Sequence, residues 1–160
     1  MNEAEQPMES IVSQEDVAKI AELLTVRDDK NRAALKIGFV STMFFKEPWT
    51  RPVREAVSAA AEEYIQTFRE HLRWARHPTG YMHPIESGRV PFPWEWLPQL
   101  EDGKDWDLGY HGAGGDEEAS EFMINAYGPD NIKKGPGYFQ VYLPLGWFAD
   151  HPGTYQQFVL

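Results

Sequence analysis

The sequence predicts an α+β fold: a mostly antiparallel twisted sheet, with one long helix and a shorter N-terminal helix packed on it. Apolar residues recur with helical spacing over residues 51–72. Aromatic, β-branched and leucine residues dominate the stretches 106–111, 122–127 and 138–143, and glycine- and proline-rich turns separate them. Because these strands follow one another without intervening helices, an antiparallel sheet is favoured.

A short amphipathic helix is expected after a polar, flexible N-terminus at residues 1–12. Ser13 and Asp16 have the spacing of a capping box, in which the hydroxyl accepts a hydrogen bond from a backbone N–H of the first turn. The apolar residues that follow lie at positions i, i+3, i+4 and i+7 and therefore share one stripe. They are Val17, Ile20, Ala21 and Leu24.

A β-hairpin is expected next, with its turn at residues 28–31 and its second arm in the apolar run 33–45. The longest helix then follows Thr50 as cap, with Pro52 in its first turn and Arg54 on its solvent side. Its apolar stripe runs through Val53, Ala56, Val57, Ala60, Tyr64, Phe68 and Leu72. We expect the helix and the sheet to meet in a core of Ile37, Phe39, Val57, Phe68, Val141 and Leu143.

The second half of the chain reads as a long loop followed by three strands. Residues 78–104 show no clean period, apart from one helical turn expected at 93–97. The strands 106–111 and 122–127 form a hairpin, and the strand 138–143 ends at Pro144. Its apolar content places that last strand in the middle of the sheet. A terminal amphipathic helix is expected from Thr154.

Composition limits the classes of function. The length of 160 residues fits one domain, here residues 13–160. A formal net charge of -10 disfavours direct nucleic-acid binding and favours a basic partner. The absence of cysteine excludes disulfides and thiol chemistry. Without a secretory signal or an apolar run of membrane-spanning length, the expected location is the cytoplasm.

No catalytic motif is present, so a non-enzymatic protein without metal or cofactor is preferred. The five histidines do not have the HExxH spacing of zinc proteases. Asp150 and His151 could act as an acid–base pair, and His111 is a further candidate. Neighbours in sequence usually point apart, and a turn role for Asp150 and His151 is therefore the stronger interpretation.

An acidic stretch is the most distinctive local feature. Between Glu101 and Glu121 the chain has eight acidic residues and one lysine. Their spacing does not match a calcium loop. Such a run forms either a solvated face or a surface that binds a basic partner. The candidate partner-binding residues are Asp102, Asp105, Asp107, Asp116, Glu117, Glu118 and Glu121.

Three blocks resemble the type VI secretion immunity family: LPLGWFADHPG at 143–153, KIGFVSTMFFKEPW at 36–49 and EHLRWARHP at 70–78. The resemblance implies a protein that neutralises a cognate effector toxin, a nuclease, by occluding its active site. The alternatives are a small hydrolase-like enzyme and a structural or regulatory binding domain. Members of the family are commonly longer, so we expect either a shortened family member or a fragment, whose uncovered apolar surface forms a homodimer.

Overall fold

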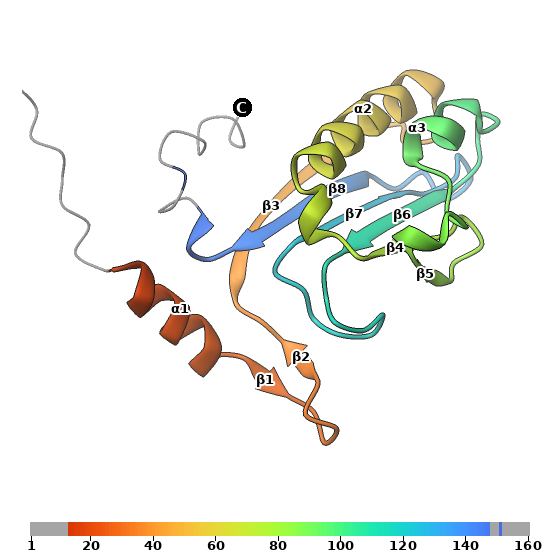
Figure 1. The fold of residues 1–160 in the computed structure, drawn as a ribbon. Helices are drawn as coiled ribbons and strands as arrows, with labels where there is room; N and C mark the ends of the chain where they lie inside the picture. Colours follow the sequence, from red (N-terminus) through yellow and green to blue (C-terminus); the bar gives the residue numbers. More distant parts are fainter. Residues whose placement is uncertain (1–12, 148–150, 152–160) are drawn as a thin grey trace, which may run out of the picture.

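A six-stranded antiparallel sheet lies at the centre of the computed structural model, which describes residues 13–147 and 151 (Figure 1). The α+β class is therefore confirmed. Each strand pairs with its neighbours in antiparallel register. In spatial order, the strands are β3 (Gly38–Phe45), β8 (Gly137–Pro144), β7 (Met123–Gly128), β6 (Trp106–His111), β4 (Trp74–Arg76) and β5 (Met82–Pro84).

Helix α2 (Arg51–Thr67) covers one face of this sheet, and the short helix α3 (Pro93–Trp96) packs beside it (Figure 1). The core lies between α2 and the sheet, where Leu108, Ile124 and Leu143 are at most 1% exposed. The Tyr64 hydroxyl on α2 donates a hydrogen bond of 2.8 Å to the Tyr142 carbonyl of β8. This contact fixes the helix across the sheet.

The predicted core is confirmed in four of its six members. Val57, Phe68, Val141 and Leu143 are buried between α2 and the sheet. The prediction was wrong for Ile37, which is 38% exposed and lies just before β3 begins, and Phe39 is only half-buried. The physical reason is that β3 is at the edge of the sheet, so among the described strands only β8 lies beside it.

The buried face of α2 differs from the predicted stripe. Arg54 is 1% exposed, whereas Ala56 and Ala60 are exposed. The Arg54 guanidinium donates to the backbone carbonyls of Trp49, Leu97 and Leu100, and it pairs with Asp102 at 2.8 Å. A buried cation is tolerated when its donors are satisfied. Arg54 thereby joins the start of α2 to the segment 97–102.

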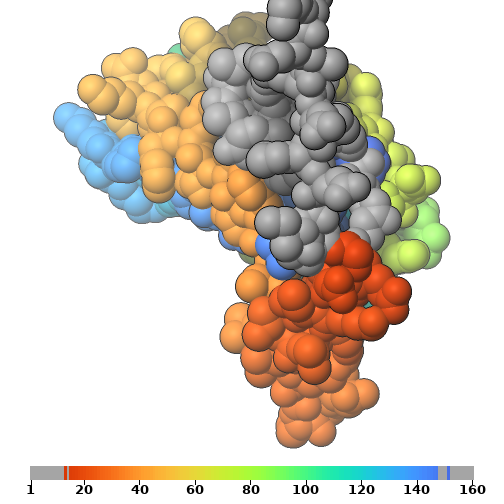
Figure 2. Space-filling model, turned by 90° about the vertical axis from the view of Figure 1, so that its left-hand side faces the viewer, coloured from red at the N-terminus to blue at the C-terminus, as the bar shows by residue number. Residues whose placement is uncertain are grey.

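The N-terminal part forms an arm that projects from the sheet (Figures 1 and 2). We call it the arm; it comprises α1 (Gln14–Leu23), β1 (Val26–Arg27) and β2 (Ala33–Leu35). Ser13 caps α1 as predicted, accepting from the Asp16 N–H at 3.2 Å. The hairpin is confirmed as β1 and β2, but its second arm is shorter than the predicted 33–45. That stretch is divided into β2, which pairs with β1, and β3, which pairs with β8. Helix α1 lies at the end of β8, where Val17 is next to Gly146, and not over the sheet face.

The remaining elements follow the predicted order. The expected turn at 93–97 is α3, and the predicted strands 106–111, 122–127 and 138–143 correspond to β6, β7 and β8, with β8 inside the sheet. The hairpin of β4 and β5 was missed, because three-residue strands show no period. Short 3₁₀ helices complete the chain at Arg69–His71, Ile85–Ser87 and Leu97–Gln99.

Some predictions concern residues outside the described part of the chain, namely the flexible residues 1–12, the turn residue Asp150 and the terminal helix from Thr154. Among the helices that the structure describes, none is long and apolar enough to cross a membrane.

Replacing Arg54 by methionine should lower the free energy of unfolding by about 3 kcal/mol, because one buried and two partly buried backbone carbonyls lose their donor. The matched change Asp102→Asn should cost less than about 1 kcal/mol, since the Asp102 side chain is 69% exposed. Urea unfolding followed by circular dichroism measures both values. Equal effects of the two substitutions would show that the carbonyl contacts of Arg54 contribute nothing.

Candidate functional site

The face of the sheet opposite α2 is the most extended candidate surface, and we call it the open face. Alternate side chains of each strand lie on it, because the other set points into the core. Most of these side chains are half-buried, and the described helices that contact the sheet lie on its other face. The open face consists of Trp74, Arg76, Met82, Asp107, Gly109, His111, Met123, Asn125, Tyr127, Tyr138, Gln140, Tyr142, Val40, Thr42 and Phe44.

Polar side chains on the open face are held by hydrogen bonds between strands and along them. The Gln140 amide donates to the Thr42 hydroxyl at 3.0 Å, and the Tyr142 hydroxyl donates to Gln140 Oε1 at 3.3 Å. On β7, the Asn125 amide donates to Met123 Sδ at 3.4 Å. These bonds restrict the rotamers of side chains that still face solvent, so the surface is ordered before any partner arrives.

Tyrosines form the middle of the open face. The rings of Tyr127 and Tyr138 lie opposite each other on β7 and β8, with centroids 6.1 Å apart. Partial burial, and next the carboxylate of Asp107, raise the pKa of Tyr138 above its ordinary value. The phenol is therefore a neutral hydrogen-bonding group at neutral pH. Tyrosine and methionine are enriched at protein interfaces, where lysine and glutamate are depleted.

One ion pair lies on the open face at β6. Arg76 Nη1 and Asp107 Oδ2 are 3.4 Å apart. Gly109 leaves room for the side chains of Asn125 and Arg76, because a Cβ at this position would lie 3.0 Å from Asn125 Oδ1 and 3.5 Å from Arg76 Nε. Burial raises the pKa of Asp107, against a smaller lowering by Arg76. Arg76 Nε is buried and has no hydrogen-bond partner in the described part of the chain.

The seven acidic residues predicted as a binding patch fall into two groups at opposite ends of β6. The first group is Asp102, Asp105 and Asp107, at the start of the strand, where Asp105 lies 3.5 Å from Lys133. The second group is Asp116, Glu117, Glu118 and Glu121, in the loop after the strand. A six-residue strand spans roughly 20 Å, so the two groups do not converge on one point. That they bind a partner stays a prediction.

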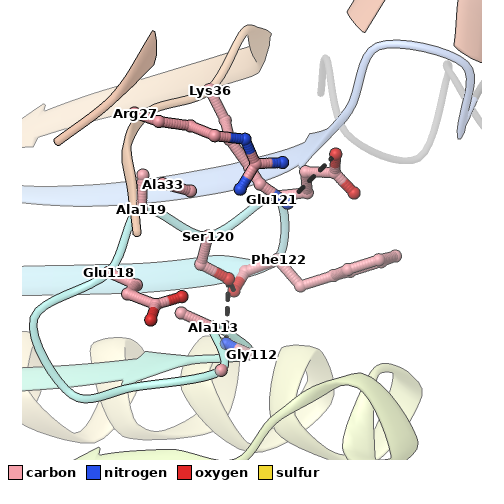
Figure 3. A pocket seen from close by; sticks show the side chains of 11 residues that line it. Arg27, Ala33, Lys36, Gly112, Ala113, Glu118, Ala119, Ser120, Glu121 and Phe122 are labelled. Atoms are coloured by element: carbon pink, nitrogen blue, oxygen red, sulfur yellow. Dashed lines mark hydrogen bonds and ion pairs between the residues drawn. The ribbon is translucent and has the colours of Figure 1, made fainter. Parts of the chain in front are cut away.

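Part of the second group holds the arm in place. Glu117 pairs with Arg32 at 3.0 Å, Glu121 pairs with Lys36 at 3.5 Å, and the Ala119 N–H donates to the Ala33 carbonyl at 2.8 Å. A polar pocket of about 200 Å³ lies between the arm and the loop. Figure 3 shows Arg27 and Lys36 on one side of it and Glu118 on the other. Glu117 and Glu121 therefore have an intramolecular role.

The candidate acid–base residues lie in different aromatic clusters. His111 is 8% exposed and its ring lies 6.4 Å from that of Trp74. Burial lowers the pKa of His111 below its ordinary value, and Asp116 opposes this less strongly. The His151 ring stacks on Trp147 with centroids 3.8 Å apart. Within residues 13–147 and 151, no group of three histidine, aspartate or glutamate side chains could hold a metal ion.

The open face was missed by sequence reasoning, although a signal was present. In β7 and β8 the positions between buried residues carry Met123, Asn125 and Tyr127, and Tyr138, Gln140 and Tyr142. A sheet face that only meets water usually carries more charge. In these strands, buried residues alternate with tyrosine and amide residues and not with lysine and glutamate. This pattern is typical of a sheet face that binds another protein.

Comparison with known proteins places this geometry in a family context. The model of the TsiV family, described as type VI immunity for VRR-NUC, matches residues 56–160. The solved structure of the Pseudomonas aeruginosa T6SS protein PA0821 has a similar fold, with a TM-score of 0.77 and 18% sequence identity. The similarity covers 90% of this chain and 43% of the P. aeruginosa protein, so this chain spans less than half the length of that protein. No curated protein matches.

The burial of His111 predicts a specific pH dependence of stability. Because its pKa is lower in the folded chain, the unfolded chain binds its proton more readily, and stability falls as pH decreases below about 6.5. His111→Gln should remove this component, so the difference in unfolding free energy between wild type and variant should shrink on acidification. Urea titrations at a series of pH values measure it. A difference that grows on acidification would contradict the prediction.

Proposed function

Because the chain belongs to the TsiV family of type VI immunity proteins, we propose that its open face binds a cognate VRR-NUC effector nuclease and occludes the active site of that enzyme. The family indicates an immunity protein for a nuclease effector. The binding surface and the occlusion are the proposed part. One observation carries them: an open face of ordered tyrosine and amide side chains, with carboxylates at both ends of β6.

The chemistry of the open face supports tight binding. Tyr127, Tyr138 and Tyr142 offer large apolar rings with polar tips, and such residues often dominate the energy of protein interfaces. The hydrogen bond from Tyr142 to Gln140, and that from Gln140 to Thr42, fix the Tyr142 side chain in advance. Side chains that are already ordered lose less conformational entropy on association. The open face is therefore suited to bind a preformed protein surface.

Charge supports a nuclease as the partner. An enzyme that acts on nucleic acid presents cationic side chains to phosphates. The chain has a net charge of -10, and carboxylates lie beyond both ends of β6, Asp105 with Asp107 near its start and Asp116 with Glu118 after its end. Carboxylates in these positions would attract the cationic groups of the nuclease and increase the rate of association. We propose that both acidic groups contribute in this way.

A non-enzymatic inhibitor needs no cofactor, and we propose none. We also propose that the chain acts in the cytoplasm and does not bind nucleic acid directly, as its negative charge favours. It stays a prediction that residues 13–160 form one domain and that this domain is a shortened version of a longer family fold.

Co-expression with the cognate effector tests the proposed surface. Wild type should restore growth, whereas the double variant Tyr138→Ala, Tyr142→Ala should not. Loss of one anchor of this kind costs roughly 2 kcal/mol, or about 30-fold in Kd, which calorimetry on the purified complex measures. Tyr81→Ala is the matched control, because Tyr81 is 74% exposed in the turn between β4 and β5. Undiminished binding by the double variant, with wild-type folding, would remove the open face from the proposal.

Charge reversal tests the acidic groups separately. Changing Asp105, Asp107, Asp116 and Glu118 together to lysine, which spares the arm contacts of Glu117 and Glu121, should slow association with the effector and flatten its dependence on salt. The control reverses four glutamates on the helical side, Glu55, Glu62, Glu63 and Glu70, and so has the same net charge. Stopped-flow measurements at several salt concentrations compare the two. If both variants associate equally fast, the acidic groups are solvated surface and only the total charge matters.

A further inference from the structure

Three arginines differ from the others in having no acidic partner among the described residues. The other arginines each form an ion pair with a carboxylate, with N–O distances from 2.8 to 3.4 Å; they are Arg27, Arg32, Arg51, Arg54 and Arg76. Arg69, Arg73 and Arg89 form no such pair in the described part of the chain, although acidic residues outnumber basic ones. The three lie within residues 69–89, so cations without a partner are concentrated in one segment.

Two of these arginines, Arg69 and Arg73, line one pocket of about 320 Å³, which we call the arginine pocket. It lies where β4, β5 and the loop after β6 meet. Its other described lining residues are Leu72, Trp74, Pro84, Ile85, Glu86 and Gly114. The two cations therefore outnumber the one carboxylate of this lining, that of Glu86.

Contacts within the chain position both arginines at the wall of the arginine pocket. The Arg73 N–H donates to the His111 carbonyl at 2.9 Å, and the Arg73 carbonyl accepts from the Ile85 N–H at 2.8 Å. The Arg69 guanidinium lies over the Phe92 ring, 5.2 Å from its centre. Neither guanidinium donates a hydrogen bond to a described acceptor. Each has five N–H donors, so both are able to bind an anion.

We propose that the arginine pocket binds a carboxylate side chain of the effector and thereby fixes the orientation of the effector on the open face. This inference rests on the proposed function. Trp74 connects the two surfaces, because it belongs to the open face and also lines the pocket. A guanidinium matches the two oxygens of a carboxylate in a fork-like pair, which adds geometric specificity to the attraction of opposite charges.

The charges around the arginine pocket favour a protein carboxylate over a nucleic-acid phosphate as its ligand. Gly114 lines the pocket, and Asp116 and Glu118 follow in the same loop; a Cβ at Gly114 would lie 3.3 Å from Glu118 Oε2. These carboxylates and Glu86 would repel a strand whose phosphates are all negative. A protein surface can instead present a carboxylate to the arginines and a cation to Glu118. This alternation of charge selects a partner with the opposite alternation.

Neutralising the arginines tests the proposal through the direction of the change in affinity. Arg69→Gln with Arg73→Gln makes the chain more negative, so an effect of total charge alone would strengthen binding of a cationic effector. Loss of the pocket contacts should instead raise Kd roughly 30-fold, mainly through faster dissociation. The control Arg51→Gln with Arg89→Gln makes the same change in charge at residues that do not line the pocket, and it should bind at least as tightly as wild type. Surface plasmon resonance with the purified effector measures the rates.

Arg73→Gln alone is the second variant, because Arg69 also packs on Phe92 and its loss could affect folding. It should raise Kd by about tenfold, since one of the two guanidinium groups remains. A short single-stranded DNA oligonucleotide, followed by fluorescence anisotropy, should not bind the wild-type chain. Oligonucleotide binding that the double arginine variant abolishes would assign the pocket to nucleic acid and overturn the proposal.

The variant Tyr138→Ala, Tyr142→Ala separates this inference from the proposed function. Wild-type or tighter binding by both arginine variants, beside lost binding by the tyrosine variant, overturns the inference and leaves the open face standing. Weakened binding by the arginine variants, beside undiminished binding by the tyrosine variant, shows that the effector does not lie on the open face. In that case the proposed function fails, and with it the orienting role of the arginine pocket.

Discussion

The structure depends on one constraint: an antiparallel sheet in which helix α2 covers only one face. Tyr64, Ile65 and Phe68 pack against Leu108, Ile124 and Leu143 and exclude water from that face. Every second residue of the strands must then point to the other side. This division places the tyrosines of β7 and β8 next to each other on the open face. The proposed effector interface is therefore a consequence of the single helical layer.

Strong periodic patterns allowed the helices and long strands to be predicted from the sequence. Val57, Phe68, Val141 and Leu143 have a spacing that only a buried face explains, and the chain order of α2, β6, β7 and β8 follows from it. Two features could not be predicted in this way. Arg54 resembles a solvated residue because its partners are backbone carbonyls far along the chain. The β4–β5 hairpin is too short to show a period.

The candidate site was harder to predict, because it depends on pairing between strands. The acidic residues are close in sequence, but β6 separates them into two groups, and Glu117 and Glu121 hold the arm through Arg32 and Lys36. The open face combines residues from strands whose neighbours are known only when the sheet order is known. Net charge and family resemblance indicated the kind of partner, whereas the surface itself came from the register of β6, β7 and β8.

Hydroxyl-radical footprinting of the complex shows directly whether the open face contacts the effector. Tyrosine side chains are oxidised at rates that follow their solvent exposure, so the method reads each position separately. Oxidation of Tyr127, Tyr138 and Tyr142 should fall sharply when the effector is bound, while Tyr81 should be oxidised as in the free chain. Unchanged oxidation of the three tyrosines in a fully formed complex would contradict the proposed contact.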